Sequence, residues 1–196
     1  MPGSAIFVKS TTLEIVKLGD RADACKSGGV DPRDDNFLKI TSEGRALATD
    51  MRLVNDEFYD NPNSKLNVMI DNAYSIWDET AEDRLTQMIF CDMGTPGGKS
   101  FNIYQDIKDK LLLKDIPEDE IVFIHDAKTD KQKDDLFRAV RCGDVRILIG
   151  STAKMGTGTN CQKKMIALHE IDIPWRPDQI TQREGRILRQ GNDNQT

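Results

Sequence analysis

Two arginines and a glutamine near the end of the chain are spaced to bind a polyphosphate. In the stretch QREGRILRQG, Gln182, Arg186 and Arg189 follow at i, i+4 and i+7, so a helix would place them on one face. Arginine offers planar, permanently charged donors that match phosphate oxygens, and Gly185 would permit a close approach. Taken alone, the pattern fits equally well a solvated basic helix end that the helix dipole favours.

A second candidate is the glycine-containing stretch ILIGSTAKMGTGTN at residues 147–160. Here a short apolar run is followed by small hydroxyl residues and then by Gly156 and Gly158. Because glycine lacks a Cβ and accepts positive φ, such a loop lets the backbone approach a phosphate or a sugar closely. Loops of this composition are common between a strand and a helix, so the loop alone identifies no ligand.

The stretch GTPGGKS at residues 94–100 resembles a phosphate-binding loop but is one residue too short. That motif requires G-x-x-x-x-G-K-[ST], and its first glycine would fall at position 93, which is Met93. A turn between a strand and a helix is the simpler interpretation. A nucleotide kinase or ATPase that uses this loop stays an alternative, and it predicts that Lys99→Ala abolishes nucleotide binding while Arg189→Ala does not.

Alternating strands and helices from Thr86 onward are expected to position these segments. Apolar runs predict strands, and helical spacing predicts helices between them: strands at 87–91, 121–124, 145–149 and 165–168, and helices at 100–113, 131–141 and 179–188. This order predicts an α/β fold in which a parallel sheet carries helices on both faces. Ligands of such sheets bind beyond the carboxyl ends of the strands.

The chain before this pattern is expected to be a mainly helical extension. Helical spacing or terminus signals predict three helices, at about 12–28, 45–54 and 64–80. The composition of residues 27–36, SGGVDPRDDN, predicts a loop. We therefore expect two domains, a helical extension at residues 1–85 and an α/β domain at residues 86–196.

Composition excludes several classes of protein. The 196 residues are 38% hydrophobic, and 27 Lys and Arg face 33 Asp and Glu, for a net charge of −6. This is too hydrophobic for a disordered chain, and no apolar run approaches the roughly 18 residues of a membrane span. The start of the chain lacks the features of a secretory signal, so a cytoplasmic protein without membrane contacts is expected. Four dispersed cysteines and two distant histidines predict no metal site.

Taken together, the motifs resemble those of a known family. A T-x-x-x-G-x-G-x-N loop, a W-x-P turn at Trp175 and the Q-x-x-G-R-x-x-R stretch follow in the order found in the second RecA-like lobe of superfamily 2 helicases and translocases. More narrowly, the order resembles the Swi/Snf-type branch, and the resemblance covers about Thr86 to Gly191. The segments DDNFLKITSEGRALATDMRLV and NAYSIWDET resemble large helicase proteins of phages and mobile elements, which often carry a DNA methyltransferase region.

The resemblance implies a role for each matching residue. ATP with Mg²⁺ lies between two lobes in this family, and the second lobe supplies arginines across the cleft. Arg186 and Arg189 would be arginine fingers, and Gln182 would position nucleotide or water. The remaining matches are loop residues: Gly156 and Gly158 would contact the nucleotide, and Ser151, Thr152, Thr95 and Lys154 would contact the nucleic acid.

The chain departs from a complete enzyme of this family because it contains no phosphate loop and no D-E-x-x box. We therefore expect a fragment of a longer motor whose partners are the first RecA-like lobe of the same polypeptide and DNA. By itself the chain should bind ATP weakly and turn it over negligibly. The alternative is a non-catalytic RecA-like scaffold that binds DNA or protein, for which DNA binding should depend on salt and not on nucleotide.

Overall fold

The computed structural model describes residues 2–97, 101–155, 160–188 and 190–194. The chain divides into two compact units, Met1–Asn67 and Val68–Thr196. The domain boundary that the sequence suggests after residue 85 stays a prediction. None of the helices in the described ranges is both long enough and apolar enough to cross a membrane.

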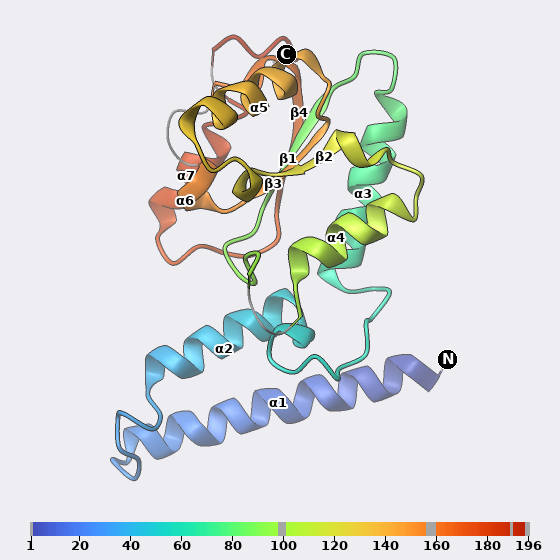
Figure 1. Ribbon diagram of the computed structural model, residues 1–196. Coiled ribbons are helices and arrows are strands. Elements are labelled where there is room, and N and C mark those ends of the chain that lie inside the picture. Colours follow the sequence, from blue (N-terminus) through green and yellow to red (C-terminus); the bar gives the residue numbers. More distant parts are fainter. Residues whose placement is uncertain (1, 98–100, 156–159, 189, 195–196) are drawn as a thin grey trace. The chain divides into compact units, whose positions relative to one another are not determined.

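The first unit is helical, as predicted. It contains α1 (Pro2–Lys26), α2 (Phe37–Thr49) and the 3₁₀ helix η1 (Met51–Leu53) (Figure 1). Arg21 of α1 forms ion pairs with Asp35, at 2.7 Å, and with Glu43 of α2. Their carboxylates raise the pKa of Arg21 further above its ordinary value. One guanidinium thus connects α1, the loop after it and α2.

Two helices in this unit have other bounds than predicted. The first helix begins at Pro2 instead of near Thr12, and the second spans Phe37–Thr49 instead of 45–54. Asn36 caps α2 at its start by accepting a hydrogen bond from the Lys39 N–H. At the other end, Asp50 is extended and its carboxylate accepts from the Arg52 N–H, so the helix stops and η1 begins.

The second unit is the predicted α/β fold. Its four strands are all parallel and lie in the order β2-β3-β1-β4. The helices α3 and α4 lie on one side of the sheet, and α5 and α7 lie on the other (Figure 1). The bounds are as follows: β1 Thr86–Phe90, β2 Ile121–Phe123, β3 Ile147–Gly150, β4 Met165–Glu170, α3 Lys65–Glu79, α4 Ile103–Leu112, α5 Asp130–Cys142, α6 Thr152–Met155, α7 Pro177–Glu184, and the 3₁₀ helices η2 Glu118–Glu120, η3 Ile124–Asp126 and η4 Gln162–Lys164.

The central strand β1 is buried on both faces, which explains its continuous apolar sequence. Met88 and Phe90 share a core cluster with Phe137 and Val140 of α5. From the opposite face, the Gln87 amide donates to the backbone carbonyl of Ala73 in α3, at 2.9 Å. Alternate side chains of one strand therefore hold helices on the two sides of the sheet.

A buried arginine fixes α3 near the amino end of the sheet. Arg146 is 2% exposed, and its Nη2 donates to the Trp77 carbonyl at 2.6 Å and to Thr80 Oγ1 at 2.8 Å. Its guanidinium also lies 5.2 Å from the Trp77 ring centroid. In turn, the Trp77 indole N–H donates to a Glu120 carboxylate oxygen at 2.6 Å. These contacts give the amphipathic helix predicted at 64–80 its defined place.

The neutral form of His169 is favoured in the folded state. Its Nε2 lies 2.8 Å from Gln87 Oε1, an acceptor, because the amide nitrogen of Gln87 is used by Ala73. Burial lowers the pKa of His169 from its ordinary value of 6.5. The unfolded chain therefore takes up this proton first, and stability should fall as pH drops below about 6.5.

Urea unfolding at pH 7.5 and pH 5.5 checks this expectation. The loss of unfolding free energy on acidification should be smaller in His169→Gln, which keeps a donor for Gln87, than in the unaltered chain. His125, whose pKa burial also lowers, is present in both proteins and cancels in the comparison. Equal losses in the two proteins would contradict the assignment.

Candidate functional site at the carboxyl edge of the sheet

Three strands end at the same level, and this determines what the carboxyl edge of the sheet can hold. Phe90, the last residue of β1, is in register with Gly150 at the end of β3 and with Glu170 at the end of β4. Two residues beyond these ends lie Asp92, Thr152 and Asp172, respectively. Because side chains alternate along each strand, equal offsets bring these three side chains together.

A single arginine joins them. Arg183 of α7 is 1% exposed, and its Nε donates to Thr152 Oγ1 at 2.8 Å. Its Nη1 donates to the Asp172 carbonyl at 2.9 Å. Its Nη2 donates to Asp92 Oδ2 at 2.8 Å and to Asp172 Oδ1 at 3.1 Å. The guanidinium also lies 5.2 Å from the centroid of the Phe90 ring.

The partners of Arg183 are also bonded to one another. Asp92 Oδ1 accepts from the Thr152 N–H at 2.6 Å, and Oδ2 accepts from the Thr152 hydroxyl at 2.8 Å. The Asp92 N–H donates to Asp172 Oδ2 at 2.7 Å. We call these four residues, Asp92, Thr152, Asp172 and Arg183, the carboxyl-edge network. The donors of the buried guanidinium are paired with carboxylates on two loops, and loss of one partner would leave a buried charge unpaired.

The thiol and the phenol beside this network are not nucleophiles. Burial, followed by the charge of Asp172, raises the pKa of the Cys91 thiol far above its ordinary value. Burial similarly raises the pKa of Tyr104, whose hydroxyl donates to the Cys91 carbonyl. Since the thiolate is the reactive form, a buried thiol with a raised pKa is a poor nucleophile at neutral pH.

Only part of the predicted nucleotide site lies in the described residues. Gln182 is exposed on α7, whereas Arg186 is buried, with 6% of its surface exposed. Arg189, Gly156 and Gly158 lie outside the described residues. Their assigned roles stay predictions.

The helix predicted at 179–188 ends earlier than expected. α7 spans Pro177–Glu184, and the Arg186 N–H donates to the carbonyl three residues back, Arg183, instead of four. Gly185 is a poor helix former, and the Asn192 side chain donates to the Ile187 and Met165 carbonyls, which holds the chain close to the start of β4. Gln182 therefore lies on α7 and Arg186 lies beyond its end, so the two residues do not share one face of a continuous helix as predicted.

The predicted nucleic-acid contacts divide into buried and exposed residues. Ser151 and Thr152 are 7% and 4% exposed, and the Thr152 hydroxyl is bonded to Asp92 and Arg183. Thr95 and Lys154 are exposed. Lys154 lies close enough to His125 to contribute, after burial, to lowering the pKa of that histidine. The nucleic-acid role of these residues stays a prediction.

Three members of the network, Asp92, Asp172 and Arg183, were not predicted as site residues, whereas Thr152 was. Arg183 lies inside the Q-x-x-G-R-x-x-R stretch, but the spacing of that stretch predicted roles for Gln182, Arg186 and Arg189. A usable signal was present, because Asp92 and Asp172 each lie shortly after an apolar strand, where polar site residues of parallel sheets occur. Which arginine is buried is not visible in the sequence.

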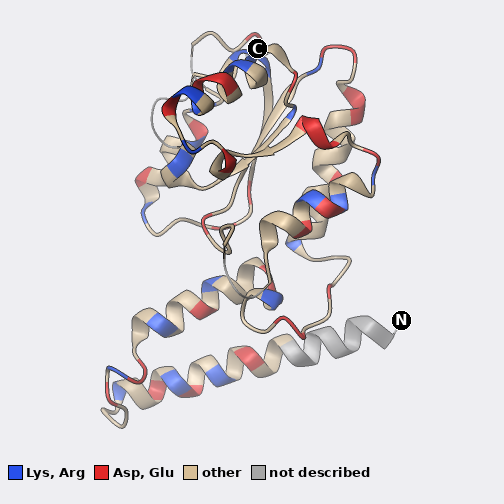
Figure 2. Ribbon diagram, viewed as in Figure 1, with Lys and Arg blue, Asp and Glu red and all other residues tan. Residues whose placement is uncertain are grey.

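Acidic and basic residues are interleaved elsewhere on this unit. Figure 2 shows Lys and Arg between Asp and Glu along α5, where Lys133 pairs with Asp130 and Arg138 with Asp135. This helix therefore carries no stripe of one sign. Over the described ranges, no group of three or more His, Cys, Asp or Glu side chains is arranged to hold a metal ion.

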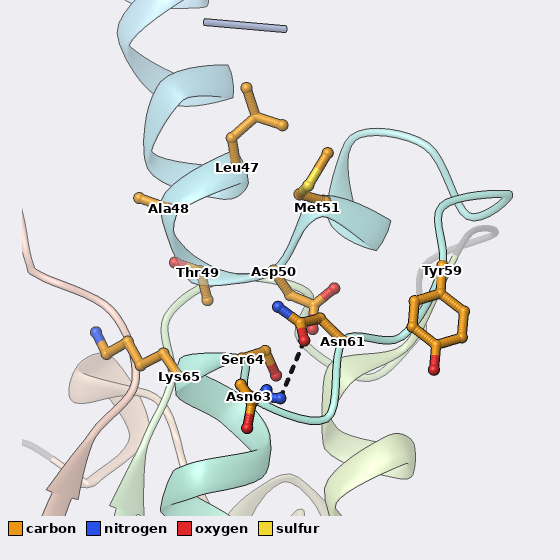
Figure 3. A pocket seen from close by; sticks show the side chains of 10 residues that line it. All are labelled: Leu47, Ala48, Thr49, Asp50, Met51, Tyr59, Asn61, Asn63, Ser64 and Lys65. Carbon is orange, nitrogen blue, oxygen red and sulfur yellow. Dashed lines mark hydrogen bonds between the residues drawn. The ribbon is translucent and has the colours of Figure 1, made fainter. Parts of the chain in front are cut away.

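The first unit contains a pocket of about 190 Å³ (Figure 3). It lies at the corner between the end of α2 and the start of α3, and Tyr59 of its lining is 62% exposed. It contains none of the predicted site residues. Its lining comprises Leu47, Ala48, Thr49, Asp50, Met51, Tyr59, Asn61, Asn63, Ser64 and Lys65.

Comparison with known protein families gives a match that covers most of the second unit. The family model described as the helicase conserved C-terminal domain matches residues 74–191, which is more than half of the chain. The match contains the whole sheet, the carboxyl-edge network and the arginine-containing stretch after α7. A search among curated proteins found no matching relative.

Proposed function

On the premise that this chain belongs to the family of helicase conserved C-terminal domains, we propose that it is the second lobe of an ATP-dependent DNA helicase or translocase of superfamily 2. Its fold is the α/β, RecA-like fold of such a lobe, a parallel sheet with helices on both faces. The order of the motifs, with DIPWRP at residues 172–177 before the arginine stretch, supports the Swi/Snf-type branch. The phage or mobile-element origin and a fused methyltransferase belong to the same proposal.

One observation carries this proposal beyond the family match. Arg183 connects the segment that holds Gln182 and Arg186 to the loop after β3 that holds Ser151 and Lys154. A motor lobe must hold its nucleotide-facing and nucleic-acid-facing segments in a fixed relation. An edge at which both segments meet provides that relation.

In the proposed enzyme, ATP lies between this lobe and a first RecA-like lobe. Arg186 and Arg189 bind the transferred phosphoryl group, and Gln182 positions the nucleotide or the attacking water. Gly156 and Gly158 allow the loop that carries them to approach the nucleotide closely. Because Arg186 is buried, this role requires its guanidinium to become accessible when the two lobes close.

DNA is proposed to lie across the loops after β1 and β3. Thr95 and Lys154 are exposed there and can contact phosphates directly. Ser151 and Thr152 are buried, so their part is to hold the loop or to offer backbone groups at its surface. Lysine contacts of this kind give affinity that depends on salt and carries no sequence information.

Magnesium is assigned to the partner lobe. Among the described residues of this chain no cluster of acidic or histidine ligands fits a metal, and arginines do not bind cations. Magnesium would neutralise phosphate charge when bound with ATP. The arginines of this chain would supply donors on the other side of the phosphates, beside Gln182 and the loop that carries Gly156 and Gly158.

ATP turnover tests the proposal. A protein that carries both lobes should hydrolyse ATP faster with duplex DNA than without it, while the 196-residue chain alone should hydrolyse none. Hydrolysis by the isolated chain that Lys99→Ala abolishes would instead support the alternative of a nucleotide-binding loop at residues 94–100. DNA binding that depends on salt, with no hydrolysis by the two-lobed protein, would support a scaffold.

A further inference from the structure

Arg183 sits between the two halves of the proposed site in sequence as well as in space. It follows Gln182 directly and precedes Arg186 by three residues, and its Nε contacts Thr152, the first residue of α6. We infer that Arg183 is a positioning residue that couples the arginine-bearing segment after α7 to the loop after β3, with Asp92 and Asp172 as its anchors. This inference rests on the proposed function, because only a motor needs the two segments to move together.

The directions of the hydrogen bonds support coupling over simple packing. The guanidinium is planar, and three of its nitrogens donate to three different chain segments, those after β1, β3 and β4. A bond of 2.8 Å is lost when its atoms separate beyond about 3.5 Å, so a shift of less than about 1 Å at Thr152 would break its bond to Nε. Because Arg183 is buried, such a break leaves donors without water, and the segments should shift together.

Asp92 is the residue through which the coupling is best tested. It follows β1, far in the sequence from both segments, and it accepts from Thr152 with both oxygens and from Arg183 with Oδ2. The substitution Asp92→Asn keeps the shape of the side chain but leaves only one acceptor, so the new NH₂ group must face donors. The Asp92 side chain is 25% exposed, which lets water offset part of the loss and favours a folded variant.

Hydrogen exchange on this chain measures the coupling directly. In Asp92→Asn, the amides of residues 151–155 and 183–188 should both exchange about tenfold faster, whereas those of α4 stay unchanged. Asp135→Asn is the matched control, because Asp135 is exposed and its ion-pair partner is Arg138 of its own helix. Faster exchange confined to residues 151–155, or spread evenly over the sheet, would overturn the inference.

A second pair of variants keeps the test decisive if Asp92→Asn does not fold. Thr152→Val removes only the hydroxyl that Arg183 contacts, whereas Thr152→Ser retains it. The valine variant should raise exchange at residues 183–188, across the contact, and the serine variant should not. Equal exchange at 183–188 in the two variants would refute the coupling.

Turnover of the two-lobed protein distinguishes this inference from the proposed function. Asp92→Asn should reduce turnover with DNA about tenfold more than turnover without DNA, while the KM for ATP stays within about twofold. An equal fall with and without DNA would indicate a structural role and overturn the coupling. A two-lobed protein without any hydrolysis would overturn the proposed function itself.

Discussion

Replacing Arg186 or Arg189 with alanine in a protein that carries both lobes is expected to reduce DNA-stimulated ATP turnover by about 10³- to 10⁵-fold. This is the effect of an arginine that stabilises the charge of phosphoryl transfer, equivalent to roughly 4 to 7 kcal/mol of transition-state free energy. In the proposed role, the arginine would interact more strongly with the transition state than with bound ATP. The loss should therefore appear mainly in kcat, measured by steady-state turnover at saturating ATP and DNA.

A matched variant separates loss of the finger from loss of positive charge. Arg138→Ala removes an arginine whose side chain is 69% exposed on α5 and pairs only with Asp135, and it should turn over ATP at the unaltered rate. Arg186→Lys keeps the charge but loses the planar pair of donors, so it should recover little activity. Full activity in both alanine variants would remove the finger assignment and leave the chain a scaffold.

Replacing Arg183 with methionine is expected to lower the free energy of unfolding by about 3–5 kcal/mol. Methionine retains part of the apolar contact with Phe90, but it leaves Asp172, which is 2% exposed, and Asp92 without their cation. Breaking a buried ion pair by removing one partner costs this much because the remaining charge is uncompensated. Urea unfolding followed by circular dichroism measures the change.

Two further variants test that explanation. Arg176→Ala removes an arginine that is 73% exposed and pairs with Asp178 at 2.6 Å, and an exposed pair of this kind contributes at most about 1 kcal/mol. Adding Asp92→Asn and Asp172→Asn to Arg183→Met removes the unpaired charges and should restore part of the lost stability. If Arg183→Met is as stable as Arg176→Ala, the network does not support the fold.

Much of the second unit was predictable from local patterns. The central strand at Thr86–Phe90 and the helix at Asp130–Cys142 each lie within one residue of prediction at both ends. Strands that are buried on both faces read as short continuous apolar runs, and helices that cover them read as amphipathic. These signals are local, so the α/β fold class followed from them without further information.

Hydrogen bonds account for two of the helix ends that were wrongly predicted, those of α2 and α7. The Asp50 carboxylate stops α2 at Thr49, and Asn192 holds the carbonyl of Ile187 just beyond α7. The first effect depends on one side chain that accepts from a nearby backbone N–H. The second depends on Asn192, whose amide also donates to the Met165 carbonyl, a group that only the fold brings close. The periodicity of hydrophobic residues, which predicts helices, indicates neither of these hydrogen bonds.

By itself, the sequence determined the fold class, the carboxyl edge as the place for a site and the arginine stretch as its main charge. Tertiary structure alone decided which groups meet there: β1, β3 and β4 end level, so Asp92, Thr152 and Asp172 converge on Arg183 instead of Arg186. Strand register and the burial of one arginine among several depend on contacts between segments distant in the chain. Sequence patterns within one segment do not predict those contacts.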